Sequence, residues 1–325
     1  MKRVMLVLAA GFIVVAGCNK SESPKEDFNP AETDVALQRN CAAQEVLEEQ
    51  LKADPSLRVR MDKIEEFTQR AIANPSAYRL LSSGIIEIPV VVNVLYKTAA
   101  ENISLAQIQS QIDVLNKDFS ATNTDYNLTS TYQTVKSGDI GVRFVLDVVN
   151  RKSTNKKSWQ LNDAMKKSSQ GGIDPTSPTT KLNLWVCNLT GGYLGYAQFP
   201  GGAAATDGVV CDNNAVGTTG SAQAPFNKGR TATHEIGHWM NLRHIWGDAT
   251  CGNDLVGDTP THNTANYGCP SAGHLSTCSG TPVEMTMNYM DYTDDACMYM
   301  FSLGQKSRML AVFASGGPRN SFAQP

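Results

Sequence analysis

Residues 233–244, Thr-His-Glu-Ile-Gly-His-Trp-Met-Asn-Leu-Arg-His, restrict the fold of this chain more than any other segment. His234 and His238 are four residues apart, so a helix would place both imidazoles on one face, where they can bind one metal ion. His244 can supply a third ligand only if the helix ends and the chain turns back, and this turn falls at Asn241. The spacing therefore predicts a helix, a turn and a catalytic zinc site with three protein ligands and one position left for water.

Glu235 is the residue that predicts a reaction at this site. It follows the first histidine, where its side chain can reach a metal-bound water rather than the metal. Because zinc activates its bound water and polarises a carbonyl group, a carboxylate in this position is expected to act as the general base in hydrolysis. The alternatives are histidines that pack inside an ordinary helix and a zinc site that is inactive.

The pattern of apolar residues predicts an α/β (α+β) fold. A β-branched run over residues 85–96 is typical of a buried strand. Ser104 is placed to cap a helix whose apolar face carries Ile108, Ile112, Leu115 and Phe119. Further strands are expected at residues 142–149, 182–189, 193–199 and 208–211, and further helices from about Lys228 and over residues 302–313. Strands and helices interleave early and loops dominate later, which indicates a loop-rich C-terminal half.

Residues 1–18 are typical of a secretory signal peptide. Two basic residues precede an apolar run over residues 4–16, which is short for a helix that spans a bilayer. Residues 15–18, Val-Ala-Gly-Cys, resemble the lipobox of bacterial lipoproteins, which predicts a lipid anchor at Cys18; a plain signal peptide is the alternative. The chain is therefore expected to be exported, as a cell-envelope lipoprotein or a secreted protein, with membrane attachment only through that anchor.

Three segments follow the signal peptide. Residues 19–32, rich in Ser, Glu, Lys, Pro and Asn, predict a flexible tether. Residues 33–83 carry apolar residues at helical spacing, interrupted at Pro55 and Pro75, and predict a helical prosegment. Residues 84–325 then form the catalytic domain. The formal net charge of -3 lacks the basic excess typical of nucleic-acid binding, so no nucleic-acid partner is expected.

Cysteines in an exported chain are expected to form disulfides. Four of them lie in a segment that is crowded with Gly, Asp, Thr and Asn and has little core of its own: Cys251, Cys269, Cys278 and Cys297. Of the three possible pairings, Cys251 with Cys278 and Cys269 with Cys297 is favoured. Cys187 and Cys211 lie in predicted strands and either pair or remain buried thiols, and Cys41 is left over.

Residues 234–244, 288–292, 194–200 and 294–298 together resemble the metzincin metallopeptidases. Within that clan the chain is most similar to the pappalysin family, in particular its bacterial ulilysin-like or cytophagalysin branch. The resemblance implies a metzincin-type fold, with a twisted mixed five-stranded sheet, a backing helix, an active-site helix and a loop-rich C-terminal subdomain. Asn241 replaces the family's glycine at the turn, and asparagine tolerates a left-handed backbone better than most residues.

The resemblance also implies roles for residues outside the histidine motif. Met290 would form the apolar floor beneath the three imidazoles, and an ordinary core methionine is the alternative. Tyr292 would help to stabilise the tetrahedral intermediate, and a core aromatic residue with a satisfied hydroxyl is the alternative. Gly195, Tyr196 and Ala197 match the edge strand along which an extended substrate aligns.

Cys41 lies in the prosegment, in the sequence Arg39-Asn40-Cys41-Ala42. This sequence is similar to the family's Arg-x-Cys-Gly cysteine switch, with Ala42 in place of the glycine. In such a switch the prosegment thiolate binds the zinc and displaces the catalytic water until the prosegment is removed. An unpaired structural cysteine is the alternative.

Two acidic regions complete the expected site. Asp254, Asp258 and Thr259 lie where ulilysin-like enzymes carry structural calcium, and a solvated acidic loop is the alternative. Asp294 and Asp295 follow the methionine turn, where the family builds its primed-side pocket. A carboxylate there would favour a basic residue after the scissile bond.

The sequence thus predicts a secreted, monomeric zinc endopeptidase that is made as a latent zymogen. Its expected cofactors are Zn²⁺ and Ca²⁺, and its expected partner is a protein or peptide substrate. Two alternatives remain: a surface binding module with a degenerate zinc site, and a zinc hydrolase that acts on a non-peptide bond. The intact Glu235 and the complete ligand set argue against the first, and the resemblance to the substrate strand argues against the second.

Overall fold

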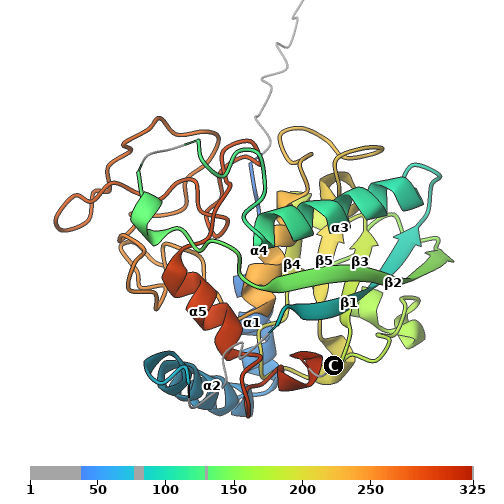
Figure 1. Cartoon of the computed structure of the whole chain (residues 1–325). Helices are drawn as coiled ribbons and strands as arrows, with labels where there is room; N and C mark the ends of the chain where they lie inside the picture. Colours follow the sequence, from blue (N-terminus) through green and yellow to red (C-terminus); the bar gives the residue numbers. More distant parts are fainter. Residues whose placement is uncertain (1–37, 77–83, 129–130, 324–325) are drawn as a thin grey trace, which may run out of the picture. The chain divides into compact units, whose positions relative to one another are not determined.

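A mixed five-stranded sheet lies at the centre of the fold, as predicted (Figure 1). The computed structural model describes residues 38–76, 84–128 and 131–323. The strands lie in the order β2-β1-β3-β5-β4, and β4 runs antiparallel to β5 while the other neighbours are parallel. Their bounds are β1 (Ile86–Tyr96), β2 (Val142–Ser153), β3 (Leu182–Cys187), β4 (Gly195–Ala197) and β5 (Val209–Asp212).

The β-branched run of β1 explains its central place. Residues 90–95 are all buried, because parallel neighbours flank β1 on both sides and other elements cover both faces of the sheet. β2, at the sheet edge, is half exposed and extends to Ser153, four residues beyond the predicted end. Its exposed part lacks the continuous apolar pattern on which the prediction depended.

Two helices pack against the sheet and against each other. α3 (Leu105–Phe119) begins at Ser104, whose hydroxyl accepts the Gln107 N–H at 3.1 Å, and it packs on β2. α4 (Arg230–Trp239) packs on β4 and β5, and every one of its residues is buried. These are the backing helix and the histidine-bearing helix that the sequence predicted.

Loops dominate the chain after α4. Residues 240–302, all of them described, contain isolated β-bridges but no strand or α-helix. Disulfides between Cys251 and Cys278 and between Cys269 and Cys297 cross-link this region, in the favoured pairing. α5 (Leu303–Ala311) follows, with Ser302 and Gln305 forming a capping box. The other described cysteines are buried free thiols, at Cys41, Cys187 and Cys211.

Two helices precede the sheet in the chain. α1 (Ala43–Ala53) packs on β4, α2 (Ser56–Ala73) packs on α5, and Pro55 separates them. Both belong to one compact unit, Leu37–Pro325. The predicted signal peptide, the tether and Cys18 lie outside the described residues. Among the residues that are described, no helix has the length and apolar character needed to cross a membrane.

Candidate metal centre

α4 carries two of the three histidines and ends where their geometry requires. His234 and His238 lie one turn apart on α4, and both side chains are fully buried. The Asn241 N–H donates to the His238 carbonyl at 2.9 Å, and Asn241 has a φ of 71°, the left-handed backbone expected at this position. The chain therefore turns back after the helix and brings His244 beside the other two imidazoles.

Three imidazole nitrogens converge at one point. His238 Nε2 lies 3.2 Å from His234 Nε2 and 3.1 Å from His244 Nε2. The Nδ1 atoms each face an oxygen acceptor: the Tyr289 carbonyl at 2.6 Å from His234, the Leu242 carbonyl at 2.8 Å from His238, and the Asp248 carboxylate beside His244. Each Nδ1 therefore carries the ring proton, and the three Nε2 lone pairs point toward one another. Such lone pairs repel unless a cation lies between them, so this donor set fits zinc.

Burial favours the neutral form of the His234 and His238 rings. It lowers the pKa of His234 well below its usual range and that of His238 to about 3, and the neighbouring imidazoles add to both shifts. A neutral imidazole is the form that binds a metal ion, so His234 and His238 need no deprotonation step at neutral pH.

Cys41 is the fourth residue at this point. Its Sγ and one nitrogen from each of the three histidines lie within 4.8 Å of one another, the one such group of His, Cys, Asp or Glu found among the described residues. Backbone hydrogen bonds hold the segment in place: the Leu194 N–H donates to the Asn40 carbonyl at 2.8 Å, and the Ala42 N–H donates to the Gly195 carbonyl at 2.9 Å. The segment thus runs parallel to the start of β4.

Glu235 lies between Cys41 and β4. The Cys41 Sγ donates to Glu235 Oε2 at 3.3 Å. Gly195 permits this approach, because a Cβ there would lie 3.0 Å from the Glu235 Cγ and 2.7 Å from the Val210 carbonyl. Burial raises the pKa of Glu235 to about 8, against the opposing effects of the Cys41 hydrogen bond and the Arg39 charge. Burial and the Glu235 charge raise the pKa of the Cys41 thiol well above its usual range, whereas a cation at the imidazoles would favour the thiolate.

Met290 and Tyr292 both adjoin the histidines. The Met290 side chain is fully buried against α4, and a Cβ on Gly237 would lie 2.4 Å from its Sδ. The Tyr292 hydroxyl donates to the Cys41 carbonyl at 3.0 Å, and its ring centroid is 4.9 Å from that of His244. The Tyr292 hydroxyl therefore bonds the very segment that lies over the metal centre.

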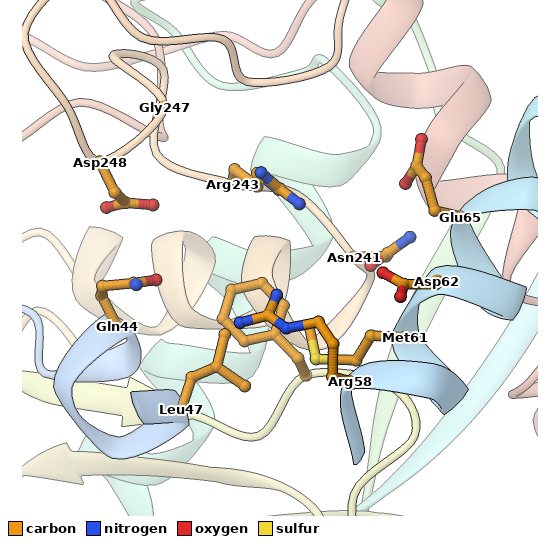
Figure 2. A pocket seen from close by; sticks show the side chains of 11 residues that line it. Gln44, Leu47, Arg58, Met61, Asp62, Glu65, Asn241, Arg243, Gly247 and Asp248 are labelled. Carbon is orange, nitrogen blue, oxygen red and sulfur yellow. The ribbon is translucent and has the colours of Figure 1, made fainter. Parts of the chain in front are cut away.

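A cavity of about 250 Å³ adjoins the metal centre (Figure 2). Asp248, whose carboxylate binds His244 Nδ1, lines it on one side. Phe199 also lines it, with its ring centroid 5.2 Å from that of His238. Residues of α1 and α2 supply the opposite wall, so these two helices cover this space without filling it.

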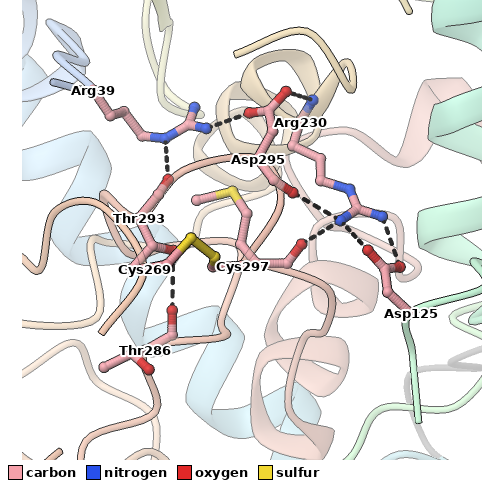
Figure 3. The surroundings of a disulfide bond; sticks show 9 residues. Arg39, Asp125, Arg230, Cys269, Thr286, Thr293, Asp295 and Cys297 are labelled. Atoms are coloured by element: carbon pink, nitrogen blue, oxygen red, sulfur yellow. Dashed lines mark hydrogen bonds and ion pairs between the residues drawn. A yellow bond between two sulfur atoms is a disulfide. The ribbon is translucent and has the colours of Figure 1, made fainter. Parts of the chain in front are cut away.

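Arg39 is held by buried partners outside that cavity (Figure 3), and the groups that contact its guanidinium, above all Asp295, are called the Asp295 pocket. Its Nη2 donates to Asp295 Oδ1 at 2.5 Å, and the two side chains are 1% and 0% exposed. Its Nε donates to the Thr293 carbonyl at 3.1 Å, and its guanidinium carbon lies 5.0 Å from the centre of the Phe226 ring. Asp295 therefore contacts the Arg39 cation, whereas Asp294 is partly exposed and does not.

β4 is the predicted substrate strand, and its backbone groups, rather than the Tyr196 side chain, are available to a peptide. The Tyr196 hydroxyl is fully buried and donates to Asp163 Oδ1 at 2.9 Å. Gly195 and Ala197 carry little or no side chain. Backbone groups at an edge strand bind an extended peptide regardless of its sequence.

The residues of the predicted calcium site point to different partners. The Thr259 hydroxyl donates to Asp254 Oδ2 at 2.9 Å. Asp258 instead accepts the Ser302 hydroxyl at 2.6 Å and the Gly304 N–H at 2.8 Å, and so binds the N-terminus of α5. The calcium assignment stays a prediction, and Asp258 already has partners for both carboxylate oxygens.

Two features of the site were absent from the sequence prediction. Asp248 lies four residues after His244, and an acidic residue near a histidine ligand is a usable signal, because ligating histidines commonly donate their second N–H to a carboxylate. Arg308 donates to both Glu65 oxygens, at 3.0 and 2.8 Å, and to the Asn241 carbonyl at 3.3 Å. No local pattern marks these contacts.

Known proteins are similar to this chain in sequence. The family model described as pregnancy-associated plasma protein-A, peptidase M43, matches residues 178–314. An extracellular metalloprotease of Verticillium alfalfae is 36% identical over 240 residues, which cover 70% of this chain and 78% of that protein.

Solved structures agree over a longer span. A promirolysin mutant of Tannerella forsythia is 39% identical, with a TM-score of 0.80, and the match covers 88% of this chain and 97% of that chain. Mature mirolysin of the same organism, in complex with a cleaved peptide, is 42% identical with a TM-score of 0.70, covering 74% and 96%. The metzincin-type fold is thereby confirmed. The chain is a metalloendopeptidase and belongs to the pappalysin (M43) family of metzincins.

Proposed function

We propose that this chain is a secreted zinc endopeptidase made as a latent zymogen. One observation carries the proposal: the Cys41 Sγ and three histidine nitrogens lie within 4.8 Å of one another. A thiolate and three imidazoles complete a tetrahedral zinc site and leave no position for water or for a substrate carbonyl. The similarity to promirolysin, a pro-form by its name, supports such a latent state. Removal of the prosegment would then open the fourth position.

The chemistry follows from what Cys41 contacts. Zinc, when bound, supplies an activated water and polarises the scissile carbonyl. Glu235 lies 3.3 Å from the Cys41 Sγ, the atom that stands in for that water, so Glu235 is placed to take the proton and to pass it to the leaving amine. The Tyr292 hydroxyl, which binds the Cys41 carbonyl in the zymogen, is free to donate to the developing oxyanion once the prosegment leaves.

The proposed substrate is a peptide that lies along β4. The cleaved peptide bound to mature mirolysin supports this substrate class. The Asp295 pocket would take a basic side chain after the scissile bond, and the guanidinium of Arg39, which fills the pocket in the zymogen, supports this preference.

Export is part of the same proposal. The fungal relatives are named extracellular metalloproteases, which supports a secreted protein. A lipid anchor at Cys18 remains our proposal, and incorporation of labelled fatty acid into the wild type but not into Cys18→Ala would test it. We also keep calcium near Asp254 and a monomeric state as proposals, to be tested by calcium titration and by light scattering.

Two variants test the function directly. After removal of the prosegment, the wild type should cleave casein, and Glu235→Ala should lose this activity while it still binds zinc. Full casein cleavage by Glu235→Ala would remove Glu235 from its role. Absence of cleavage by the zinc-loaded wild type would instead favour a binding module with a degenerate site.

Latency has its own test. The uncleaved Cys41→Ala chain should hydrolyse peptide, whereas the uncleaved wild type should not. Cys187→Ala is the matched control, because that thiol is equally buried in β3 and is not among the residues that converge with the histidines. Unchanged latency in Cys41→Ala would show that Cys41 is only a structural cysteine.

A further inference from the structure

The prosegment crosses the metal centre and contacts both sides of it. Arg39 precedes Cys41 and occupies the Asp295 pocket, whereas Gln44 and Leu47 follow Cys41 and line the cavity of Figure 2. Between these points, residues 40–42 are bonded to the start of β4 by the Asn40 carbonyl and the Ala42 N–H. The cavity and the Asp295 pocket therefore lie on opposite sides of the ligands. If a basic residue after the scissile bond enters the Asp295 pocket, residues before that bond face the cavity.

The Arg243 side chain lines this cavity. It stands in the chain between Asn241 and the ligand His244, and its partly buried side chain lines the cavity, where Figure 2 shows it between Asp248 and Asn241. No hydrogen bond or ion pair to its guanidinium is formed within residues 38–76, 84–128 and 131–323. Asp248, whose carboxylate accepts from His244 Nδ1, lines the same cavity, and Arg243 acts on this carboxylate through its charge alone.

Arg308 depends on the prosegment for its counterion. Its side chain is almost fully buried and donates to both Glu65 oxygens, at 3.0 and 2.8 Å. The other acceptors of its guanidinium are the carbonyls of Leu255 and Asn241, each at 3.3 Å. In the described part of the chain, Glu65 is the one carboxylate that pairs with Arg308. When α2 leaves, Arg308 loses Glu65, and the face of α5 that α2 covered opens to solvent.

Both arginines act on the Glu65 carboxylate, Arg308 through hydrogen bonds and Arg243 through its charge. Burial opposes the charge of this carboxylate, yet its pKa is lowered, chiefly by Arg308 and further by Gln69 and Arg243. Both cations thus act on one carboxylate, and both adjoin the turn at Asn241. Arg58 and Asp62, which also line the cavity, belong to α2 and depart with it. The mature protein therefore keeps two guanidinium groups where the zymogen holds Glu65.

We propose that Arg243 and Arg308 bind a substrate carboxylate, from an Asp or Glu residue before the scissile bond, in the place that Glu65 occupies in the zymogen. Two guanidinium groups at one turn offer charge-assisted hydrogen bonds to such a side chain. This inference rests on the proposed peptidase function and adds a second specificity site to it. The preferred substrate is then acidic before the cleaved bond and basic after it.

Paired peptides test the proposal with the processed enzyme. Each pair differs only by Glu or Gln at one of the four positions before the cleaved bond, and every peptide has Arg directly after that bond. At one position the wild type should show a kcat/KM about tenfold higher for Glu, mostly through KM, as expected for a single charge-assisted contact. The ratio should fall below about twofold in Arg243→Gln and should shrink with added salt.

Controls separate this site from general electrostatics and from folding. Arg143→Gln removes a cation of β2 that pairs with Asp139, outside the cavity, and should keep the tenfold ratio. Arg243→Glu should reverse the preference toward a Lys peptide, a gain that a misfolded variant cannot give. Arg308→Lys keeps a buried cation but loses the bidentate geometry, and should reduce the ratio without abolishing it.

Each outcome decides a distinct claim. Equal cleavage of Glu and Gln peptides by the wild type at all four positions overturns the proposed site and leaves the peptidase function intact. A tenfold ratio that persists in Arg243→Gln removes Arg243 from the site. If the wild type cleaves no peptide of either series, the proposed function fails and this inference fails with it.

Discussion

Replacing Arg39 with alanine should open the zymogen without altering a metal ligand. The Arg39 and Asp295 side chains form an ion pair that is 1% and 0% exposed. Alanine keeps the backbone bonds of residues 40–42 but leaves Asp295 buried without its cation while the prosegment is closed. Loss of one partner of a buried pair typically costs about 3–5 kcal/mol. The Lys228 N–H still donates to Asp295 Oδ2 at 2.7 Å, so we expect a cost of about 3 kcal/mol.

A cost of about 3 kcal/mol corresponds to a shift of about 100-fold in the equilibrium between closed and open prosegment. The assay is hydrolysis of a quenched fluorescent peptide by the uncleaved chain, expressed as a fraction of the rate of the processed enzyme. Arg39→Ala should raise that fraction about 100-fold over the wild type. Gel analysis before and after the assay must show that the chain stays uncleaved.

Arg70→Ala is the matched control for this prediction. Arg70 lies in the same prosegment, and its pair with Glu66 spans 3.8 Å with side chains 57% and 70% exposed. Exposed pairs contribute little, so this variant should remain as latent as the wild type. If the uncleaved Arg39→Ala and Arg70→Ala chains hydrolyse the peptide at equal rates, the argument that the buried Arg39 pair holds the chain closed is refuted.

Three further predictions concern the stability of the main domain. Asn241→Gly should have the same midpoint of urea unfolding as the wild type. Asn241→Val should lose about 1–2 kcal/mol of unfolding free energy, because a β-branched residue fits poorly at a φ of 71°. Equal unfolding midpoints for the Val variant and the wild type would contradict this reasoning. Gly237→Ala places a Cβ 2.4 Å from the Met290 Sδ and should cost about 1–3 kcal/mol, and Met290→Ala should cost less in that background than alone. Burial raises the pKa of Asp254 from 3.8 to about 6, so in chelator the folded chain holds this proton more tightly than the unfolded chain. The protonated Asp254 therefore stabilises the folded chain by about 3 kcal/mol below about pH 4, and this stabilisation is lost as the pH rises through 6. In Asp254→Asn, this pH dependence should disappear from the free energy of unfolding measured with urea. An unchanged slope in that variant would assign the titration to another group.

Single helices and strands could be predicted wherever a short stretch of the sequence determines them. The β-branched run of β1, the Ser104 cap of α3 and the capping box at Ser302 each depend on neighbours in the chain. Strand order and the pairing of β4 with β5 depend on distant segments. The sequence alone offered no physical basis for them, and they entered the prediction through the resemblance to metzincins.

In the site as well, local contacts could be predicted from the sequence and contacts between distant segments could not. The spacing of His234, His238 and His244 implied the convergence of their side chains, because a helix and one left-handed turn determine it. The anchors of the prosegment follow no such rule. Arg39 and Asp295 are 256 residues apart in the chain, and Arg308 and Glu65 are 243 apart. Contacts of this kind depend on how the prosegment helices dock, which no periodicity in the sequence encodes.

The order of Arg39 and Cys41 along the chain has a consequence for self-cleavage. In the zymogen, the basic side chain in the Asp295 pocket comes before the residue at the metal centre. In the proposed substrate, the basic side chain comes after the cleaved bond. The prosegment therefore passes over the histidines in the opposite polarity to a substrate. In the proposed zymogen its amide groups therefore run backwards relative to Glu235, so the enzyme should not cleave this strand, and its removal should require a cut elsewhere in the chain.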